Sequence, residues 1–272
     1  MKRYDVYAFQ ALNEDQVEIL SGLLSNIDNA GVEETDVGLT VYLQEAEVNL
    51  RLMDEVARMV KANYLRSTLD DQNWNSLWES SFEPVVVDDF VTVRADFHPP
   101  TRGKELEIVI TPKMSFGTGH HATTWSMLSE MRNIPFNGAR VLDFGTGTGI
   151  LAILAEKLGA LSVKAIDNDD WSIENAKENI MRNNSTRIAL MKADDASGNE
   201  EFDVILANIN KNVIAENMKW LRSQITAGGT VLLSGLLVDD EPEIREKAKE
   251  EAFQVTNKTE RSNWLCLKLS PI

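Results

Sequence analysis

The segment VLDFGTGTGIL, residues 141–151, constrains the fold of this chain more than any other stretch. The apolar run ARVLDF is typical of a buried strand, and ILAILAEKLGA has the spacing of an amphipathic helix. Gly145, Gly147 and Gly149 separate the two elements. Glycine lets the backbone turn tightly and approach a ligand. A strand, a glycine loop and a helix in this order predict a doubly wound α/β sheet that binds a ligand beyond the carboxyl end of the strand.

Strands and helices continue to alternate through the rest of the chain. Further strands are predicted at SVKAID, IALMKA, DVILAN and TVLLSG, and helices at SIENAKENIMRNN and around 211–224 and 240–251. FQVTNKT and WLCLKLS, separated by charged residues, suit a hairpin. The pattern predicts a mostly parallel seven-stranded sheet covered on both faces, with one antiparallel strand at its edge.

The first part of the chain has a different pattern. YDVYAFQ and GLTVYLQ read as strands, and helical spacing follows Asn13 and again Glu45. This βαββα order suits a small α+β ferredoxin-like domain, although the pattern does not locate its fourth strand. Residues 66–100 combine acidic punctuation with Trp74, Trp78 and Phe82, and then a strand pair. We therefore expect an N-terminal recognition domain over 1–65, an aromatic linker over 66–100 and a catalytic domain over 101–272.

The chemistry of the glycine loop indicates which nucleotide it would bind. A dinucleotide fingerprint has the spacing G-x-G-x-x-G, but here Ile150 takes the third glycine position. Asp143 would place negative charge where a pyrophosphate lies, and so favours a cationic ligand without phosphates. S-adenosylmethionine fits this description. Asp167 ends the next strand, where a carboxylate can accept hydrogen bonds from both ribose hydroxyls. Asp169 and Asp170 read as caps of the following helix.

Asn208 ends the strand DVILAN and marks the expected acceptor side of the pocket. Its amide oxygen and carbonyl suit the binding of an amine, or a contact with the cofactor. The sequence Asn208-Ile209-Asn210 differs from the N-P-P-[YF] of methylases that act on amide or base nitrogens. Asn208 is therefore the candidate catalytic residue.

Four segments together resemble the bacterial methyltransferases of ribosomal protein L11. They are MSFGTGHHATT, VLDFGTGTGILAILAEKLGA, AIDNDDWSIENAKENIMRNN and DVILANI, in that order. The resemblance implies a class I methyltransferase fold, S-adenosylmethionine as cofactor, and methylation of lysine side chains and the N-terminal amine of L11. It implies cofactor contacts by Thr124, Gly145, Asp167 and Asn208, with Thr118 and Gly147 as further candidates and Phe116 as part of a lid. The sequence departs from the family pattern at Thr146, where a cysteine is common, and at Asp169-Asp170.

Metal binding and cysteine chemistry find little support in the sequence. His120 and His121 are adjacent, so their side chains diverge in an extended loop, and no cysteine or acidic cluster completes a ligand set. Helix capping or polar packing suits them better, and we expect no metal. A single cysteine, Cys266, allows no disulfide within the chain.

The net charge limits the partners that we expect. The chain carries 27 basic and 43 acidic side chains, a formal charge of −16. Such a surface repels phosphate backbones, so we expect no direct nucleic-acid binding, and it attracts basic proteins or serves solubility alone. The N-terminus meets charge too early for a secretory signal, and no window is apolar enough to span a bilayer. We expect a cytoplasmic monomer.

The expected reaction places few demands on acid–base groups. An amine must be neutral to attack a methyl carbon, whereas a free lysine has a pKa near 10.4. Desolvation and a nearby cation both lower that pKa, so a dedicated base is not required. Three alternatives stay open: a methyltransferase of another protein or a small amine, a nicotinamide oxidoreductase, and a ribosome-assembly factor that only binds.

Overall fold

A computed structural model describes the chain. The described residues are 3–24, 27, 29–35, 38–44, 46, 49–70, 83–101, 103, 105–111 and 121–272. Trp74, Trp78 and Phe82 of the expected linker lie outside them, as do all residues from 112 to 120. The chain divides into two compact units, Met1–Ser81 and Phe82–Ile272. Among the described residues, no helix has the length and apolar character that crossing a bilayer requires.

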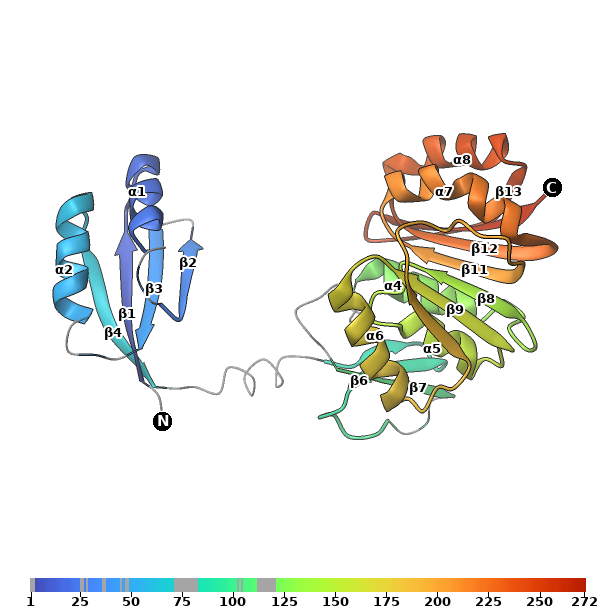
Figure 1. Ribbon diagram of the computed structural model, residues 1–272, viewed down its shortest axis with the longest axis horizontal. Coiled ribbons are helices and arrows are strands. Elements are labelled where there is room, and N and C mark those ends of the chain that lie inside the picture. The colour runs from blue at the N-terminus through green and yellow to red at the C-terminus, as the bar shows by residue number, and fades with distance from the viewer. Residues whose placement is uncertain are drawn as a thin grey trace. The chain divides into compact units, whose positions relative to one another are not determined.

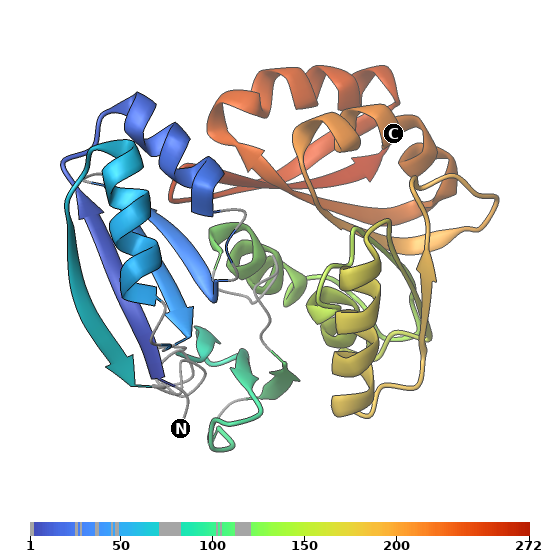
Figure 2. The same cartoon turned by 60° about the vertical axis from the view of Figure 1, so that its left-hand side comes forward.

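The first unit is a four-stranded antiparallel sheet with two helices. Its elements are β1 (Arg3–Gln10), α1 (Glu14–Leu24), β2 (Gly31–Thr35), β3 (Gly38–Gln44), α2 (Asn49–Val60) and β4 (Tyr64–Asp70). The strand order β2-β3-β1-β4 is that of a ferredoxin-like fold. Alternate residues of β1 and β3 point toward the helices, which lie side by side over one face of the sheet (Figure 2). Tyr7, Phe9 and Val41 form a core there with Leu20 and Met53.

The fourth strand of this unit, which the sequence pattern did not locate, lies across the expected boundary between the N-terminal domain and the linker. β4 pairs with β1 and runs from Tyr64 to Asp70, so the expected domain boundary at residue 65 falls inside a strand. Arg66 of this strand reaches the buried Asp5 of β1, with its Nη2 at 2.7 Å from Asp5 Oδ1. Arg66 and Asn49 hold the pKa of Asp5 below its ordinary value, against the opposing effect of burial.

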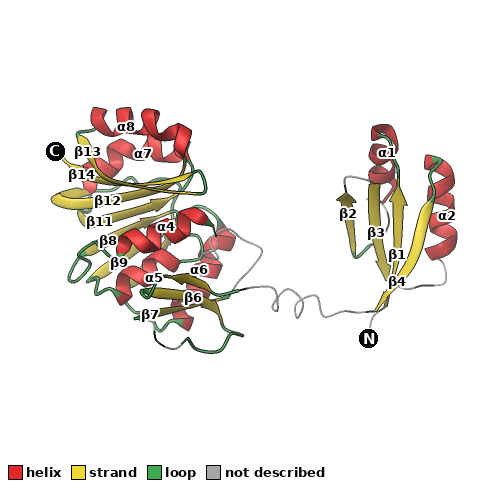
Figure 3. Ribbon diagram, turned by 180° about the vertical axis from the view of Figure 1, so that it is seen from behind, coloured by secondary structure: helices red, strands yellow, loops and turns green. Residues whose placement is uncertain are grey.

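The second unit begins with a small three-stranded sheet. β5 (Val85–Val87) pairs antiparallel with β6 (Val91–Ala95), which pairs parallel with β7 (Leu106–Ile110). The predicted strand pair at the end of the linker is thus present as β5 and β6. Its apolar side chains share a core with α4 (Ala122–Met131) and α5 (Ile150–Lys157). Figure 3 shows β6 and β7 beside α5.

A seven-stranded sheet forms the body of the second unit (Figure 1). Its order is β10-β9-β8-β11-β12-β14-β13. The strands are β8 (Arg140–Phe144), β9 (Ser162–Asp167), β10 (Ile188–Lys192), β11 (Phe202–Asn208), β12 (Ile225–Leu237), β13 (Phe253–Arg261) and β14 (Trp264–Pro271). The helices are α4 and α5 with α6 (Asp170–Arg182), α7 (Lys211–Gln224) and α8 (Glu241–Glu250), and a short 3-10 helix, η1 (Val238–Asp240), precedes α8. The predicted fold class is confirmed.

Burial on both faces explains why these strands read as nearly continuous apolar runs. Val141 of β8 packs in one core with α4 and α5, and its neighbour Leu142 packs in the other core with α7 and α8. A strand whose two faces are both covered has apolar residues at successive positions. The prediction of a sheet covered on both faces is therefore correct.

One expectation about the sheet is wrong. We expected the antiparallel strand at the edge, but β14 lies between β12 and β13 and is antiparallel to both. The hairpin folds back so that the later strand inserts next to β12. Its tight turn is formed by Ser262 and Asn263, which both have positive φ.

The sheet order places a binding crevice between β8 and β11. From β8 the chain moves outward through β9 and β10, and then returns to β11 on the other side of β8. In an open α/β sheet, ligands bind at the carboxyl ends of strands where the order reverses in this way. The glycine loop follows β8 and Asn208 ends β11, so both lie at this crevice.

Candidate cofactor and acceptor site

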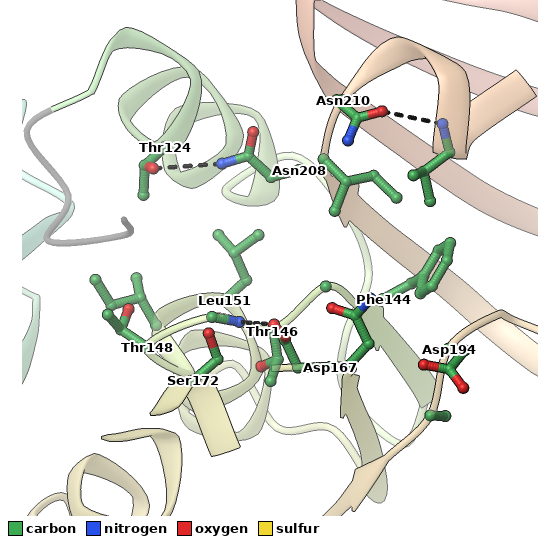
Figure 4. A pocket seen from close by; sticks show the side chains of 17 residues that line it. Thr124, Phe144, Thr146, Thr148, Leu151, Asp167, Ser172, Asp194, Asn208 and Asn210 are labelled. Carbon is green, nitrogen blue, oxygen red and sulfur yellow. Dashed lines mark hydrogen bonds between the residues drawn. The ribbon is translucent and has the colours of Figure 1, made fainter. Parts of the chain in front are cut away.

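A cavity of about 300 Å³ opens at the carboxyl ends of the parallel strands. Seventeen of the described residues line it, and Figure 4 shows their side chains. The predicted residues Thr124, Gly145, Gly147, Asp167 and Asn208 all belong to the lining. Phe116 and Thr118 lie outside the described residues. The structure thus brings together five of the seven predicted site residues, although direct contact with a cofactor stays a prediction for each.

The glycine loop is held by backbone hydrogen bonds to the neighbouring strand. The N–H groups of Gly145 and Thr146 both donate to the carbonyl of Ile166, at 2.9 Å each. Gly147 N–H donates to Asp167 Oδ2 at 2.8 Å. Gly145 has a φ of +75°, which non-glycine residues rarely adopt. Asp167 therefore fixes the loop in addition to lining the cavity.

Asp143 lies beneath the loop, and our expectation that its charge lies where a pyrophosphate would bind is wrong. It is fully buried and is absent from the described residues that line the cavity. Its Oδ2 accepts hydrogen bonds from Thr146 Oγ1 at 2.6 Å and from the N–H of Ala152, in the first turn of α5, at 3.1 Å. This carboxyl caps α5, whose own N-cap residue, Gly149, has no side chain to do so.

Burial strongly perturbs the ionisation of Asp143. Desolvation raises its pKa from 3.8 to about 7, the nearby Asp167 charge adds to this, and the hydrogen bonds from Thr146 and Ala152 oppose it. The pKa in the folded state thus lies above that in the unfolded state. The folded protein retains a proton that the unfolded chain releases, so the stability contribution of this group falls as pH rises from about 4 to about 7.

This pH dependence is testable with Asp143→Asn, which cannot ionise. The free energy of unfolding of the variant minus that of the wild type should increase by about 3 kcal/mol from pH 5 to pH 8, because only the wild type loses stability as Asp143 ionises. Urea denaturation of both proteins at the two pH values measures this. Comparing the difference between proteins cancels the contributions of all other titrating groups. An equal difference at both pH values would show that Asp143 ionises normally.

Thr124 and Asn208 form the upper side of the cavity in Figure 4. Thr124 lies in the first turn of α4, and His121 caps that helix by accepting a hydrogen bond from Thr123 N–H. Asn208 Nδ2 donates to Thr124 Oγ1 at 3.3 Å. Because the amide nitrogen is used in this way, Asn208 Oδ1 is the atom available to accept from a ligand. The capping role expected for His121 is confirmed, whereas His120 is outside the described residues.

Sequence reasoning missed several lining residues. Asp194 lies just after the end of β10, in the same way that Asp167 lies at the end of β9. The rule that ligands bind beyond strand ends would have identified Asp194. Asn210 also lines the cavity, and its Oδ1 caps α7 by accepting from Val213 N–H at 3.1 Å. Asp169 lies outside the lining and caps α6, as expected, by accepting from Ser172 N–H at 2.8 Å.

The side chains that line the cavity fit a cationic nucleoside better than a dinucleotide. Among the described residues that line it there is no lysine, arginine or histidine, whereas Asp167 and Asp194 supply two carboxylates. A pyrophosphate would meet no positive side chain there. Phosphates often bind the free N–H groups at the start of a helix, but in the first turn of α5 the N–H of Ala152 already donates to Asp143. Apolar side chains from Phe144, Ile209 and Val213 complete the walls.

Comparison with known proteins agrees with this chemistry. Residues 8–271 match the model of the family described as ribosomal protein L11 methyltransferase (PrmA). The ribosomal protein L11 methyltransferase of Porphyromonas gingivalis is 37% identical over 288 residues, which is 99% of this chain and 98% of that protein. The enzyme of the same name from Phocaeicola vulgatus is 36% identical over 264 residues, 94% of each chain.

A solved structure also indicates similarity to ribosomal protein L11 methyltransferases. The crystal structure of ribosomal protein L11 methylase from Lactobacillus delbrueckii subsp. bulgaricus superimposes with a TM-score of 0.64 at 31% identity. The match covers 70% of this chain and 99% of that chain. The predicted family resemblance is confirmed, and the chain belongs to the ribosomal protein L11 methyltransferase family.

Proposed function

We propose that this protein transfers methyl groups from S-adenosylmethionine to lysine side-chain and N-terminal amino groups of ribosomal protein L11. Family membership over residues 8–271 supports the reaction and the substrate. The observation that carries the proposal is the pairing of Asn208 with Thr124 beside a cavity that offers two carboxylates and no cationic side chain among its described lining residues.

S-adenosylmethionine would supply an electrophilic methyl group on a sulfonium. Asp167 would hold the ribose hydroxyls, since its carboxylate also faces the cavity. Asp194 would accept from the exocyclic amine of the adenine, because a carboxylate only accepts hydrogen bonds. Gly145 and Gly147 would let the backbone come close to the cofactor, because glycine has no side chain.

The chain's own residues act on the incoming amine by desolvation and orientation. The apolar side chains of Ile209 and Val213 reduce the solvation of an ammonium in the cavity and so lower its pKa, which favours the neutral nucleophile. Asn208 Oδ1 accepts from an N–H of the amine and directs its lone pair. The ammonium loses its proton to water before the attack, so no dedicated base is required. The neutral nitrogen then takes the methyl group as the sulfonium becomes a neutral thioether, and alignment of the reactants supplies most of the rate enhancement.

The first unit, with its own core, would recognise the ribosomal protein. We also propose that the enzyme acts as a cytoplasmic monomer. The charge of −16 supports an enzyme that does not bind nucleic acid directly.

Incubation with radiolabelled S-adenosylmethionine and purified L11, followed by mass-spectrometric site mapping, tests the proposed function. We expect label on lysine side chains and the N-terminal amine of L11. Label on another protein or a small amine, with none on L11, would redirect the proposal to a different acceptor. Tight binding of NADH with no binding of S-adenosylhomocysteine would overturn it.

The role of Asp167 predicts a defect in cofactor affinity. The two carboxylate oxygens of Asp167 accept hydrogen bonds from the N–H groups of Gly147 and Asp169. Asp167→Asn replaces one of these oxygens with an NH₂ group, which can only donate. Loss of one charged hydrogen bond costs about 1.5–3 kcal/mol, so we expect roughly a 50-fold rise in the Kd for S-adenosylhomocysteine. Calorimetric titration measures this. Asp195→Asn is the matched control, because Asp195 is exposed and outside the lining; equal Kd values for both variants would contradict the assignment.

A further inference from the structure

Ile209 follows Asn208 directly and lies against two glycines. A Cβ built on Gly145 would lie 2.1 Å from Ile209 Cγ2. A Cβ built on Gly235 of β12 would lie 2.1 Å from the carbonyl oxygen of Ile209. Both distances are far below van der Waals contact, so only glycine permits either approach. The side chain of Ile209 is thus in close contact with the glycine loop, and its backbone is in close contact with β12.

The backbone contact is part of a continuous set of hydrogen bonds. Ile209 N–H donates to the carbonyl of Ser234 at 3.2 Å, and Asn208 is paired with Ser234 in the β11–β12 ladder. The pairing of β12 with β14 shifts register between Leu233 and Leu236, around Gly235. Ser234 is fully buried, and its hydroxyl donates to the carbonyl of Leu265 in β14 at 2.8 Å. The position of Ile209 is therefore fixed by the centre of the sheet.

Asn208 and Asn210 flank this fixed residue, and both side chains line the cavity. Figure 4 shows Asn208 directed toward Thr124, and Asn210 hydrogen-bonded at the start of α7. A displacement of the Ile209 backbone would move both side chains. A reacting group that is misplaced by about 1 Å can cost about 100-fold in rate.

We propose that Ile209 is a positioning residue for Asn208, and that Gly235 is required because it admits the Ile209 carbonyl. Ile209 sets the direction in which the Asn208 amide enters the cavity, through its contacts with Gly145 on one side and Gly235 on the other. Gly235 lies outside the cavity lining, so its effect on the reaction passes through Ile209. This inference rests on the methyl transfer proposed above.

Gly235→Ala tests the proposal directly. The added methyl group must displace the Ile209 carbonyl, and the φ of +85° adds strain. We expect kcat for L11 methylation to fall about 20-fold, with the Kd for S-adenosylhomocysteine within about threefold of the wild type. The matched control is Gly228→Ala in the same strand, where a Cβ meets nothing within 4 Å, and we expect its kcat to be unchanged.

The two measurements separate positioning from folding and from the proposed function. Calorimetric stoichiometry gives the folded fraction, and a loss of kcat in fully folded Gly235→Ala supports positioning. Normal kcat in Gly235→Ala, beside an active wild type, overturns the positioning role. Failure of the wild type to methylate L11 overturns the proposed function instead.

A second pair of variants decides the matter if Gly235→Ala does not fold. Ile209→Val retains the Cγ2 that contacts Gly145, whereas Ile209→Ala removes it. We expect Ile209→Ala to lose about tenfold in kcat and Ile209→Val to lose severalfold less. Gly145→Ala should also be about tenfold less harmful in the Ile209→Ala background, because the clashing atom is gone. Equal kcat in the Val and Ala variants, or equal harm in both backgrounds, would overturn the proposal.

Discussion

Deleting residues 1–81 is expected to lower kcat/KM for intact ribosomal protein L11 about a thousandfold, because binding energy from a remote recognition domain is lost. The same deletion is expected to leave the affinity for S-adenosylhomocysteine within about twofold of the full chain. All described residues that line the cavity lie between 124 and 213, in the second unit. The prediction thus assigns recognition of the protein substrate to the first unit and binding of the cofactor to the second.

The two units have separate cores, which makes this truncation feasible. Among the described residues, the buried members of the apolar cluster of the first unit lie between Tyr7 and Val60. The described residues of the two clusters of the second unit begin at Val85. A domain with its own core can fold alone. We therefore expect residues 82–272 to be folded and to bind the cofactor.

A short peptide from the N-terminus of L11 provides the control substrate. It offers the same amine without the folded surface that the first unit would bind, so the full chain and the truncated enzyme should methylate it at similar rates. Radiometric assays on the peptide and on intact L11 give both values of kcat/KM. Full activity of residues 82–272 on intact L11 would assign recognition to the second unit.

Much of the second unit was predictable because its helices and strands follow their local patterns. The helix predicted around 211–224 is α7, Lys211–Gln224, where an amphipathic pattern begins at a capping asparagine. Site residues were predictable for a topological reason. The carboxyl ends of β8, β9 and β11 meet at one edge of the sheet, so Gly145, Asp167 and Asn208 come together even though they are far apart in sequence.

Two features of the site were not predicted: the direction in which Asp143 points from its strand, and the contact between Ile209 and Gly235. Asp143 stands near the end of β8, and from this position we expected its charge to lie where a pyrophosphate would bind. Alternation would have placed it correctly: Val141 packs under α4 and α5, so Asp143, two residues later, also points beneath α5. The contact of Ile209 with Gly235 has no local signal, since it depends on the register between β11 and β12.

Asn208→Ala is expected to reduce kcat for L11 methylation by roughly 300-fold, in the range that loss of one preorganised polar group causes in other enzymes. The variant removes the acceptor that directs the amine, and it also leaves Thr124 without its amide donor. The cofactor retains Asp167 and Asp194, so the Kd for S-adenosylhomocysteine should rise less than about tenfold. Single-turnover kinetics with saturating L11 separate the chemical step from binding.

Asn212→Ala is the matched control, since Asn212 lies in the same stretch of chain but is exposed and outside the lining. Asn208→Asp tests the chemistry further. A carboxylate keeps the acceptor but stabilises an ammonium ion, which raises the pKa of the bound amine and should move the rising limb of the pH–rate profile to higher pH. Normal turnover in Asn208→Ala would remove Asn208 from the mechanism. An unshifted profile in Asn208→Asp would mean that its side chain does not contact the amine.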